Sequence, residues 1–399
     1  MTLSVDALVV GGGPAGLAAG IVLGQAGLKV LLCERQEFPI DKVCGEGLMP
    51  TGVAHLQQLG VQRCRHFPFA GVRYVDPHGA AASATFRQGP GWGVRRIALS
   101  AALLARAQQF ESLCIMPGVH AVPQSTDEQG VVVRMGPDLV RARLLVGADG
   151  LRSPVRHWAG LQSQPPAAAR RHWRWGARQH FALPPWSAYV EVHWSGRGVE
   201  AYVTPVGPRE VGVAFLWHRG RYKELRGGVQ LIPSLLEAFP ALQERLSGAP
   251  SLSVGRAVGP MQQRVRSATS DGLLLIGDAA GYLDAITGEG LSLAFAQALA
   301  LQSTVVPALQ AGTGIVPRSA LARYRAACRR LGRSSLQLTE LTLLLSRFPT
   351  LCSHTLSALH RDPALFQQLL SANMGLQSLY RLPLLAGLAR GLLAAAWRR

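Results

Sequence analysis

The sequence predicts an α/β fold: a mainly parallel sheet, interrupted by an inserted antiparallel sheet and followed by a helical C-terminal region. Three observations predict it. A glycine-rich turn joins an apolar strand to an apolar helix near the N-terminus, short strands of alternating polarity fill the middle of the chain, and residues from 331 onward have helical periodicity. The length of 399 residues allows two or three domains.

The N-terminal turn has the spacing of a phosphate-binding loop. It runs Gly11-Gly12-Gly13-Pro14-Ala15-Gly16 between the apolar residues 7–10 and an Ala/Leu/Val-rich stretch, which predicts strand, tight turn and helix. Gly11 allows the sharp turn, Gly13 lets bare backbone approach a pyrophosphate, and Gly16 lets the helix pack close to the strand. A pyrophosphate would then lie at the helix N-terminus, where free N–H groups and the helix dipole favour anions.

An acidic residue stands at the distance that an adenosine ribose requires. Residues 28–33 form a second apolar strand, and Glu34 follows it, 18 residues beyond Gly16, with Arg35 next in the chain. A carboxylate at this place can accept both ribose hydroxyls. We therefore predict a dinucleotide site that includes the turn, Glu34 and Arg35; the alternative is a glycine-rich turn in another kind of α/β protein.

Composition and charge limit the class of protein and its partners. Hydrophobic residues make up 48% of the chain and charged residues 16%, which argues against disorder. The net charge of +18 is carried almost wholly by arginine, since Lys29, Lys42 and Lys223 are the only lysines. An arginine-rich composition of this kind is typical of a GC-rich coding sequence, which is the favoured explanation. The functional alternatives are attraction to anionic cofactors, acidic carrier proteins or membrane surfaces; nucleic acid is not an expected partner, because the arginines are spread out and no nucleic-acid module is recognisable.

Cysteine spacing and the N-terminus indicate the compartment. The six cysteines have neither zinc nor disulfide spacing, so we expect reduced thiols and no metal site. No secretory signal precedes the first strand. These features predict a cytoplasmic protein.

The first part of the chain, residues 1–164, continues the nucleotide-binding pattern. A loop dense in glycine and proline, residues 37–52, follows the second strand and is expected to line a site. A helix is expected at 101–108 with Ser100 as its N-cap. Strands are expected at 72–75, 81–86, 114–122, 130–135 and 139–146.

Residues 165–262 change character. Their strand-like segments are short, alternate in polarity and carry many aromatic residues, a pattern typical of an antiparallel sheet. The predicted strands lie at 172–181, 188–194, 199–204 and 210–217, and two helices follow at 228–238 and 240–247. We interpret this region as an inserted substrate-binding domain.

The chain then returns to the nucleotide-binding pattern in residues 263–330. An apolar strand, 273–276, ends in Gly277-Asp278, and a long helix follows at 290–310.

Residues 331–399 form the expected helical C-terminal region, with boundaries at Pro349, Pro363 and Pro383. The last segment, 382–399, is too short and interrupted to span a bilayer. We expect it to pack over a substrate cavity or at a dimer contact, with a membrane-surface contact as the alternative. The sequence does not predict an oligomeric state.

Three glycine and acid motifs stand in order along the chain: the Gly11 turn with Glu34, then Asp149-Gly150, then Gly277-Asp278. In this order they resemble the FAD-dependent oxidoreductases of the aromatic-hydroxylase fold, the superfamily of p-hydroxybenzoate hydroxylase, which also includes geranylgeranyl reductases and flavin-dependent halogenases. The resemblance covers roughly residues 1–330. It implies a Rossmann-like FAD-binding domain, and NAD(P)H as a transient electron donor, since no second GxGxxG is present.

The resemblance implies roles for single positions. By these, Glu34 binds the adenosine ribose, Arg96 reaches the cofactor from a helix, and Asp149 lies near the pyrophosphate. Asp278 accepts hydrogen bonds from the ribityl chain; the alternative for this residue is a helix-capping acid.

The turn that opens the late helix is expected to face the flavin. It contains Gly288, Gly290 and Leu291, and its backbone N–H groups and helix dipole could stabilise the negative edge of a reduced ring. An ordinary helix start is the alternative.

The candidates for catalysis are Cys44, Glu46 and Tyr202. Cys44 and Glu46 lie in a stretch that resembles the Cys-Gly-x-x-Leu segment of geranylgeranyl reductases, close to the flavin in those enzymes. A thiol there could donate a proton to a substrate carbanion or only contact the ring, and a buried structural cysteine is the alternative. Tyr202, with Glu200, lies on a strand expected to face the cofactor domain, where it could orient a phenol or an acid; core packing is the alternative.

The sequence also departs from these relatives. The reductases carry Tyr-x-Trp-x-Phe-Pro where this chain has Glu200 to Pro205, and the halogenase signature Trp-x-Trp-x-Ile-Pro is absent there; Trp173-Arg174-Trp175 occurs too early to replace it. These departures favour an NAD(P)H-dependent monooxygenase of secondary metabolism that hydroxylates an apolar or aromatic small molecule. A C=C reductase of the geranylgeranyl type and a non-catalytic flavin-binding partner protein are the alternatives, and a halogenase is not expected.

Overall fold

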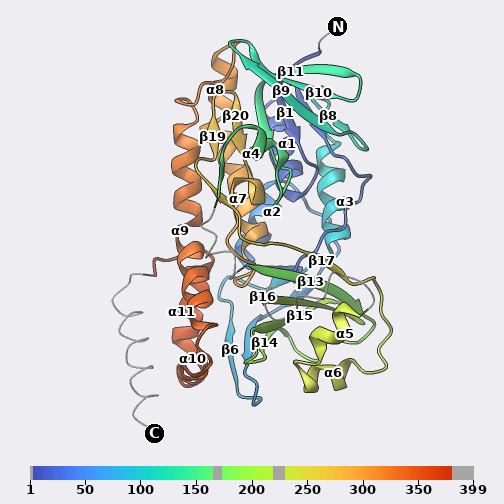
Figure 1. Ribbon diagram of the computed structural model, residues 1–399, viewed down its shortest axis with the longest axis vertical. Helices are drawn as coiled ribbons and strands as arrows, with labels where there is room; N and C mark the ends of the chain where they lie inside the picture. The colour runs from blue at the N-terminus through green and yellow to red at the C-terminus, as the bar shows by residue number, and fades with distance from the viewer. Residues whose placement is uncertain (1–2, 165–172, 219–229, 380–399) are drawn as a thin grey trace.

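The computed structural model describes residues 3–164, 173–218 and 230–379, and two sheets stand one above the other in these residues (Figure 1). The first sheet has eight strands within this part of the chain. Its order is β19 (Thr269–Ser270), β20 (Leu273–Leu275), β11 (Asp138–Gly147), β1 (Leu3–Val10), β2 (Val30–Cys33) and β8 (Leu113–Met116), with β10 (Gly130–Met135) paired to β11 and β9 (Ala121–Asp127) paired to β10.

The core of the first sheet is parallel, as predicted. β1 runs parallel to β2 and β11, β2 to β8, and β11 to β20, so the carboxyl ends of these strands meet at one edge. In α/β sheets this edge is where ligands bind. The predicted strand 114–122 is two strands, β8 and β9, because a turn around Gly118, at φ +69°, separates them.

Helices cover one face of the first sheet. They are α1 (Pro14–Gln25), α3 (Arg96–Ala107) and α7 (Gly290–Thr304), and their apolar side chains form one core with Ala7 and Val9 of β1. Leu8 and Val10 point to the other face, where they pack with β10 and with α4 (Pro154–Trp158). Both faces of the sheet are covered at β1, and burial on both sides explains why its residues form a continuous apolar run.

Helix α3 begins earlier than expected. Its first residue is Arg96, so Ser100 is not the N-cap but an interior residue. The Ser100 hydroxyl instead accepts a hydrogen bond from the backbone N–H of Ile40 at 2.9 Å. The predicted cap therefore ties α3 to the loop that follows β2.

The helical stretch that begins at Gly290 has the length and apolar composition of a membrane span. Residues Gly290–Ala311 are apolar and long enough to cross a bilayer by composition. Phe295, Ala298 and Leu301 are nevertheless fully buried in the core shared with α1, so this helix is a core element here. It is interrupted after Thr304, and α8 (Val306–Ala311) begins with Pro307 in its first turn.

The second sheet has seven strands in the described residues. Its order is β17 (Arg256–Val258), β13 (Arg174–Phe181), β16 (Glu210–His218), β15 (Val199–Gly207), β14 (Tyr189–Trp194), β5 (Gly71–Val75) and β6 (Ala81–Thr85). Neighbouring strands are antiparallel, except that β14 and β5 run parallel. The outer face packs against α5 (Leu231–Leu236) and α6 (Pro240–Leu246).

The division predicted at residue 164 does not separate the two sheets. β5 and β6 belong to residues 1–164 by sequence, but β5 pairs with β14 of the second sheet and β6 pairs with β5. The hairpin of β5 and β6 extends the edge of β14, and this long-range pairing leaves no local mark in the sequence. The second sheet is therefore built from two separate stretches of chain.

Three helices close the C-terminal side of the described chain. They are α9 (Ala322–Leu345), α10 (Pro349–Arg361) and α11 (Pro363–Asn373), and the last two begin at the predicted prolines. α10 and α11 lie against β6 (Figure 1): the ring Nδ1 of His360 is 2.7 Å from the carbonyl of Ala81, and Gln367 donates to the carbonyl of Thr85 at 2.9 Å. The segment 382–399 and Pro383 lie outside the described residues.

The remaining elements are short and join the two sheets. They are the three-stranded sheet of β3 (Gly47–Leu48), β7 (Gly91–Gly93) and β4 (Phe67–Phe69), the pair β12 (Gln162–Ser163) and β18 (Arg264–Val265), helix α2 (Pro50–Gln58), and the 3-10 turn η3 (Gly277–Ala280).

Candidate functional site

One cavity of about 750 Å³ extends between the two sheets. At one end it is lined by the turn after β1, by the loop after β11 and by η3 after β20, which are the carboxyl ends of three parallel strands. At the other end it is lined by the second sheet and by α9, α10 and α11. We call these the cofactor end and the apolar end.

The glycine turn leaves no room for side chains where the chain packs on itself. A Cβ on Gly16 would lie 1.8 Å from the carbonyl oxygen of Gly11, and Gly11 itself has φ +109° and faces the carbonyl of Ala148. Gly13 is open on its cavity side, where the nearest atom to an added Cβ is Lys42 Nζ at 3.8 Å. The geometry thus fits the assigned roles: Gly11 and Gly16 allow packing, and Gly13 allows a ligand to approach.

Glu34 directly follows β2, next to this turn. Its carboxylate is buried and accepts hydrogen bonds from the backbone N–H of Gly12 at 2.7 Å and of Gln36 at 3.1 Å. Each carboxylate oxygen has further lone pairs, so two ribose hydroxyls can still donate to it. Arg35, next in the chain, is exposed and lines the cavity.

Buried and half-buried charged side chains surround the cofactor end. Burial raises the pKa of the Asp278 carboxyl, and the cations Arg96, Lys42 and Arg156 oppose that shift. Burial also lowers the pKa of the Lys42 ammonium. Two cations, Lys42 and Arg96, therefore line the cavity beside the glycine turn.

Arg156 is the main residue that the sequence analysis missed. It is fully buried, and its guanidinium donates to the carbonyls of Ala279 at 3.0 Å and Leu151 at 2.6 Å, so it ties the loop after β11 to η3. Two glutamine side chains, Gln162 and Gln263, accept its other hydrogen bonds. An arginine in a short, otherwise apolar helix after Asp149-Gly150 was the available signal.

FAD fits this end of the cavity. Arg96 Nε and Asp149 Oδ1 are buried without a hydrogen-bond partner among the described residues. Together with the bare backbone at Gly13, they offer a donor and an acceptor to a ligand with phosphates and hydroxyls. Two of the residues that the family resemblance assigned to the cofactor, Arg96 and Asp149, therefore each keep a buried polar atom that no described protein group satisfies.

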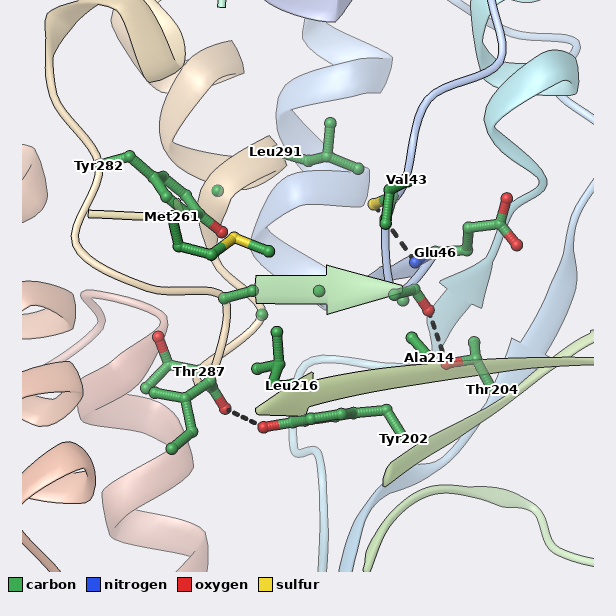
Figure 2. Close-up of a pocket in the computed structure, with 18 of the residues that line it drawn as sticks. Val43, Glu46, Tyr202, Thr204, Ala214, Leu216, Met261, Tyr282, Thr287 and Leu291 are labelled. Atoms are coloured by element: carbon green, nitrogen blue, oxygen red, sulfur yellow. Dashed lines mark hydrogen bonds between the residues drawn. The ribbon is translucent and has the colours of Figure 1, made fainter. Parts of the chain in front are cut away.

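The loop of Cys44 runs along the cavity between its two ends. Cys44 is partly exposed to the cavity, and its sulfur accepts a hydrogen bond from the backbone N–H of Glu46 at 3.3 Å (Figure 2). Thr204 on β15 donates to the carbonyl of Gly45 at 2.7 Å and holds the loop from the second sheet. The thiol is thus held at a fixed place on the cavity wall.

Glu46, the second catalytic candidate, is held by protein groups at both carboxylate oxygens. One carboxylate oxygen accepts from the backbone N–H of Arg96 at 2.8 Å, and the other lies 2.6 Å from the Nε2 of His180, which is buried on β13. In Figure 2 the carboxylate points away from the residues that surround the cavity. With φ +60° and both oxygens bound, Glu46 anchors the loop.

Glu46 shares a buried polar cluster with His180 and Arg178. Arg178 Nη1 lies 3.1 Å from His180 Nδ1, and a guanidinium can only donate, so Nδ1 accepts this bond and Nε2 faces Glu46. The same Arg178 donates to Asp41 at 2.5 Å. His180 and Arg178 therefore serve two carboxylates beneath the Cys44 loop.

Tyr202 reaches the cavity, whereas its neighbour Glu200 does not line it. The Tyr202 hydroxyl donates to the carbonyl of Ile286 at 3.3 Å (Figure 2), which links β15 to the loop before α7. Glu200 is buried in an ion pair with Arg174, which also lies 3.3 Å from Asp284 in that loop. Both residues of β15 thus fix the position of the loop expected to face the flavin.

That loop opens α7 with bare backbone toward the cavity. Gly288 has φ +72°, and α7 begins at Gly290. Gly288, Gly290 and Leu291 all line the cavity. The loop is held from the C-terminal helices, because Asn373 of α11 donates to the carbonyl of Thr287 at 3.0 Å.

The apolar end is a lobe of aliphatic and aromatic side chains that the sequence did not reveal. Burial raises the pKa of the Tyr202 and Tyr282 phenols well above 10, so both stay neutral. The side chains of the lobe come from β14, β16, α9, α10 and α11, and they include Val190, Val192, Trp194, Leu216, Leu338, Leu345, Leu356, Leu359, Phe366 and Leu370.

The fold and the cofactor end define the class of protein. A family model described as FAD binding domain matches residues 4–69 and 99–339. The chain belongs to this family and is an FAD-dependent oxidoreductase.

Two curated relatives are similar over most of their length. The chain is 29% identical over 308 residues to menaquinone reductase of Mycobacterium tuberculosis (strain ATCC 25618 / H37Rv), covering 72% of this chain and 73% of that protein. It is 23% identical over 310 residues to digeranylgeranylglycerophospholipid reductase of Methanococcus vannielii, covering 73% and 74%.

Solved structures share the fold. A flavoprotein/dehydrogenase from Cytophaga hutchinsonii superposes with a TM-score of 0.81 at 19% identity, covering 99% of each chain. The flavin-dependent brominase Bmp2 gives 0.80 at 17% identity, covering 99% of this chain and 100% of that one. At these identities the likeness shows the fold alone.

Proposed function

We propose that the protein is a reductase that saturates a carbon–carbon double bond in a long apolar molecule, with NAD(P)H as the electron source. The observation that carries the proposal is the single cavity that joins the cofactor end to the apolar lobe, with Cys44 on its wall. The lobe is lined by hydrocarbon side chains, which suits a prenyl-type chain better than a small polar ring.

The similar proteins support this class of reaction. Both curated relatives are reductases by name; one name contains menaquinone and the other a digeranylgeranyl lipid. Each of them matches this chain over about three-quarters of its own length. We carry over from them the reaction class and an apolar substrate.

The reaction balances with the groups available. A double bond gains two hydrogens, while NAD(P)H and one proton are consumed and NAD(P)⁺ is released. FAD, when bound, supplies two-electron transfer. The chain's own residues must bind the apolar molecule, exclude water and deliver a proton to carbon.

Cys44 is the proton-donating residue in this proposal. Its thiol is partly exposed to the cavity, held by the Glu46 backbone, and can give its proton to the substrate carbon and recover one from water. Other side chains of the wall are less suited, since Glu46 has both oxygens bound by protein groups and Tyr202 donates to Ile286.

An anaerobic turnover experiment tests the proposal against hydroxylation, which the sequence motifs alone favour. FAD-loaded protein is mixed with NAD(P)H and a polyprenyl quinone, with and without oxygen, and the products are weighed by mass spectrometry. We expect anaerobic turnover and a product heavier by two hydrogens. A product that gains an oxygen atom, formed only in air, would establish hydroxylation instead, and no NAD(P)H oxidation with any substrate would indicate a non-catalytic flavin protein.

A further inference from the structure

The outer face of α9 and the turn after it carry exposed apolar side chains. Leu341, Leu344 and Phe348 follow one another at spacings of three and four residues and are 37%, 48% and 53% exposed, and Leu336 is 49% exposed. These four residues are called the apolar patch below. Leu341 and Leu344 are three residues apart and lie on one side of α9, and Phe348 follows in the turn between α9 and α10.

Exposed arginines accompany the apolar patch on α9 and in the turn after it. Arg329, Arg330 and Arg333 precede it and Arg347 lies within it, and all four are exposed. Glu340 is the exposed acid in residues 329–348. Arg333 stands about 12 Å from Leu341 along the helix axis, at 1.5 Å per residue.

The inner side of the same helix faces the cavity. Leu338, Thr342 and Leu345 line it, and Leu341 belongs both to the cavity wall and to the apolar patch. α9 lies on the outside of the molecule (Figure 1). A single helix therefore separates the apolar lobe from the exposed patch.

We propose that this face of α9 docks on an anionic lipid bilayer. Leucine and phenylalanine side chains enter the boundary between headgroups and acyl chains, while arginines beside them bind the phosphates. A second copy of this chain fits less well, because a symmetric contact would bring the same arginines together in a protein of net charge +18. Docking there would let the protein take up an apolar substrate from the bilayer next to the cavity. This role of the docking rests on the proposed function.

Vesicle flotation tests the docking without any substrate. The full-length, FAD-loaded protein is mixed with vesicles of phosphatidylcholine alone or with added phosphatidylglycerol, and bound protein is read from the flavin absorbance. We expect binding to the anionic vesicles that weakens with salt, and little binding to phosphatidylcholine alone.

Two variants separate the apolar and the basic contributions. Leu344→Glu with Phe348→Glu, neither of which lines the cavity, is expected to lower the partition coefficient at least about tenfold. Arg330→Gln, Arg333→Gln and Arg347→Gln together are expected to lower it about a hundredfold on anionic vesicles.

A control variant replaces two exposed apolar side chains with glutamate at positions outside α9. Leu139→Glu with Val254→Glu alters two side chains that are 42% and 69% exposed, on β11 and in the loop before β17, and should bind vesicles like the unchanged protein. Equal loss in this control would show a general charge effect and overturn the proposal.

Three other results would also overturn it. Unchanged binding by the Leu344 and Phe348 variant would show that the apolar patch is not used. Binding that depends only on residues 380–399 would assign the contact to the C-terminal segment. Binding to an acidic protein but to no vesicle would assign the face to a protein partner.

Failure of the docking and failure of the proposed function are distinguishable. Turnover of a detergent-dispersed polyprenyl quinone measures the reaction without a bilayer, and the Leu344 and Phe348 variant should match the unchanged protein there. Absence of that turnover would count against the reductase and leave the vesicle result standing.

Discussion

The two ends of the cavity are built in different ways. At the cofactor end, short runs of consecutive residues after parallel strands provide bare backbone and a few charges, as at Gly13 and Asp278. At the apolar end, the wall is assembled from side chains of β14, β16, α9, α10 and α11. Local backbone geometry therefore forms the cofactor site, whereas the packing of side chains from distant segments determines the shape of the substrate site.

The largest expected effect is at the cofactor end, in the glycine turn. Gly16→Ala would place a Cβ 1.8 Å from the carbonyl oxygen of Gly11, and only a backbone shift can relieve that contact. We expect a loss of about 4 kcal/mol or more in unfolding free energy and no retained flavin, measured by denaturation and visible absorbance.

The matched control for Gly16 is Gly332→Ala in α9. No atom lies within 4 Å of a Cβ added there. Alanine should stabilise this helix by up to about 1 kcal/mol and leave flavin binding unchanged. Retained flavin in Gly16→Ala would contradict the account of the turn.

The next effect is at the boundary between the two ends. Glu46→Gln removes one of the two carboxylate charges beside the buried Arg178 guanidinium and leaves Asp41 as its remaining charged partner. We expect a loss of about 3 kcal/mol in unfolding free energy, measured by urea denaturation. The control is Asp6→Asn, which removes the partly exposed ion pair with Arg143 and should cost less than about 1 kcal/mol of unfolding free energy. Equal losses of unfolding free energy in the two variants would contradict a larger contribution from the buried charges.

Cys44 distinguishes chemistry from cofactor binding. Cys44→Ala should lower kcat about a hundredfold in the anaerobic assay, because proton delivery typically contributes that much, while flavin binding stays unchanged. Cys114→Ala, which removes an exposed thiol on β8, should leave kcat unaltered. An unaltered kcat in Cys44→Ala would assign the proton to water or to another group.

A smaller, pH-dependent effect is expected at the N-terminus of α7. Burial raises the pKa of the Glu289 carboxyl from 4.5 to about 8. The folded protein therefore keeps this group protonated while the unfolded chain ionises it, so its contribution to stability is full below about pH 4.5 and is lost as the pH rises toward 8.

Glu289→Gln tests that linkage. The amide cannot ionise, so the variant should be about 4 kcal/mol more stable than the unchanged protein at pH 8 and nearly equal to it near pH 4.5. Asn373, whose amide lies 3.4 Å from Glu289, can keep its contact with the glutamine carbonyl. Urea denaturation at a series of pH values measures the difference, and parallel curves would show that Glu289 is ionised in the folded protein.

The same contrast explains what the sequence could predict. The parallel sheet and the order of the three glycine and acid motifs follow from local patterns, because strand, turn and helix are encoded by consecutive residues. The pairing of β5 with β14 and the roles of Arg178 and His180 could not be predicted, since these contacts join residues that are more than a hundred positions apart. The hydrogen bond from Glu46 to His180 on β13 likewise has no signature near Glu46 in the chain.

The central claim is that one cavity holds both the flavin and the apolar substrate, and a difference spectrum tests it most directly. FAD-loaded protein is titrated with a polyprenyl quinone under anaerobic conditions without NAD(P)H, alongside a Leu359→Trp variant that fills the apolar lobe. We predict that the ligand perturbs the visible flavin band of the unchanged protein and not that of the variant, although both bind FAD equally. Ligand binding that leaves the flavin band unchanged, or that perturbs it equally in both proteins, would contradict the shared cavity.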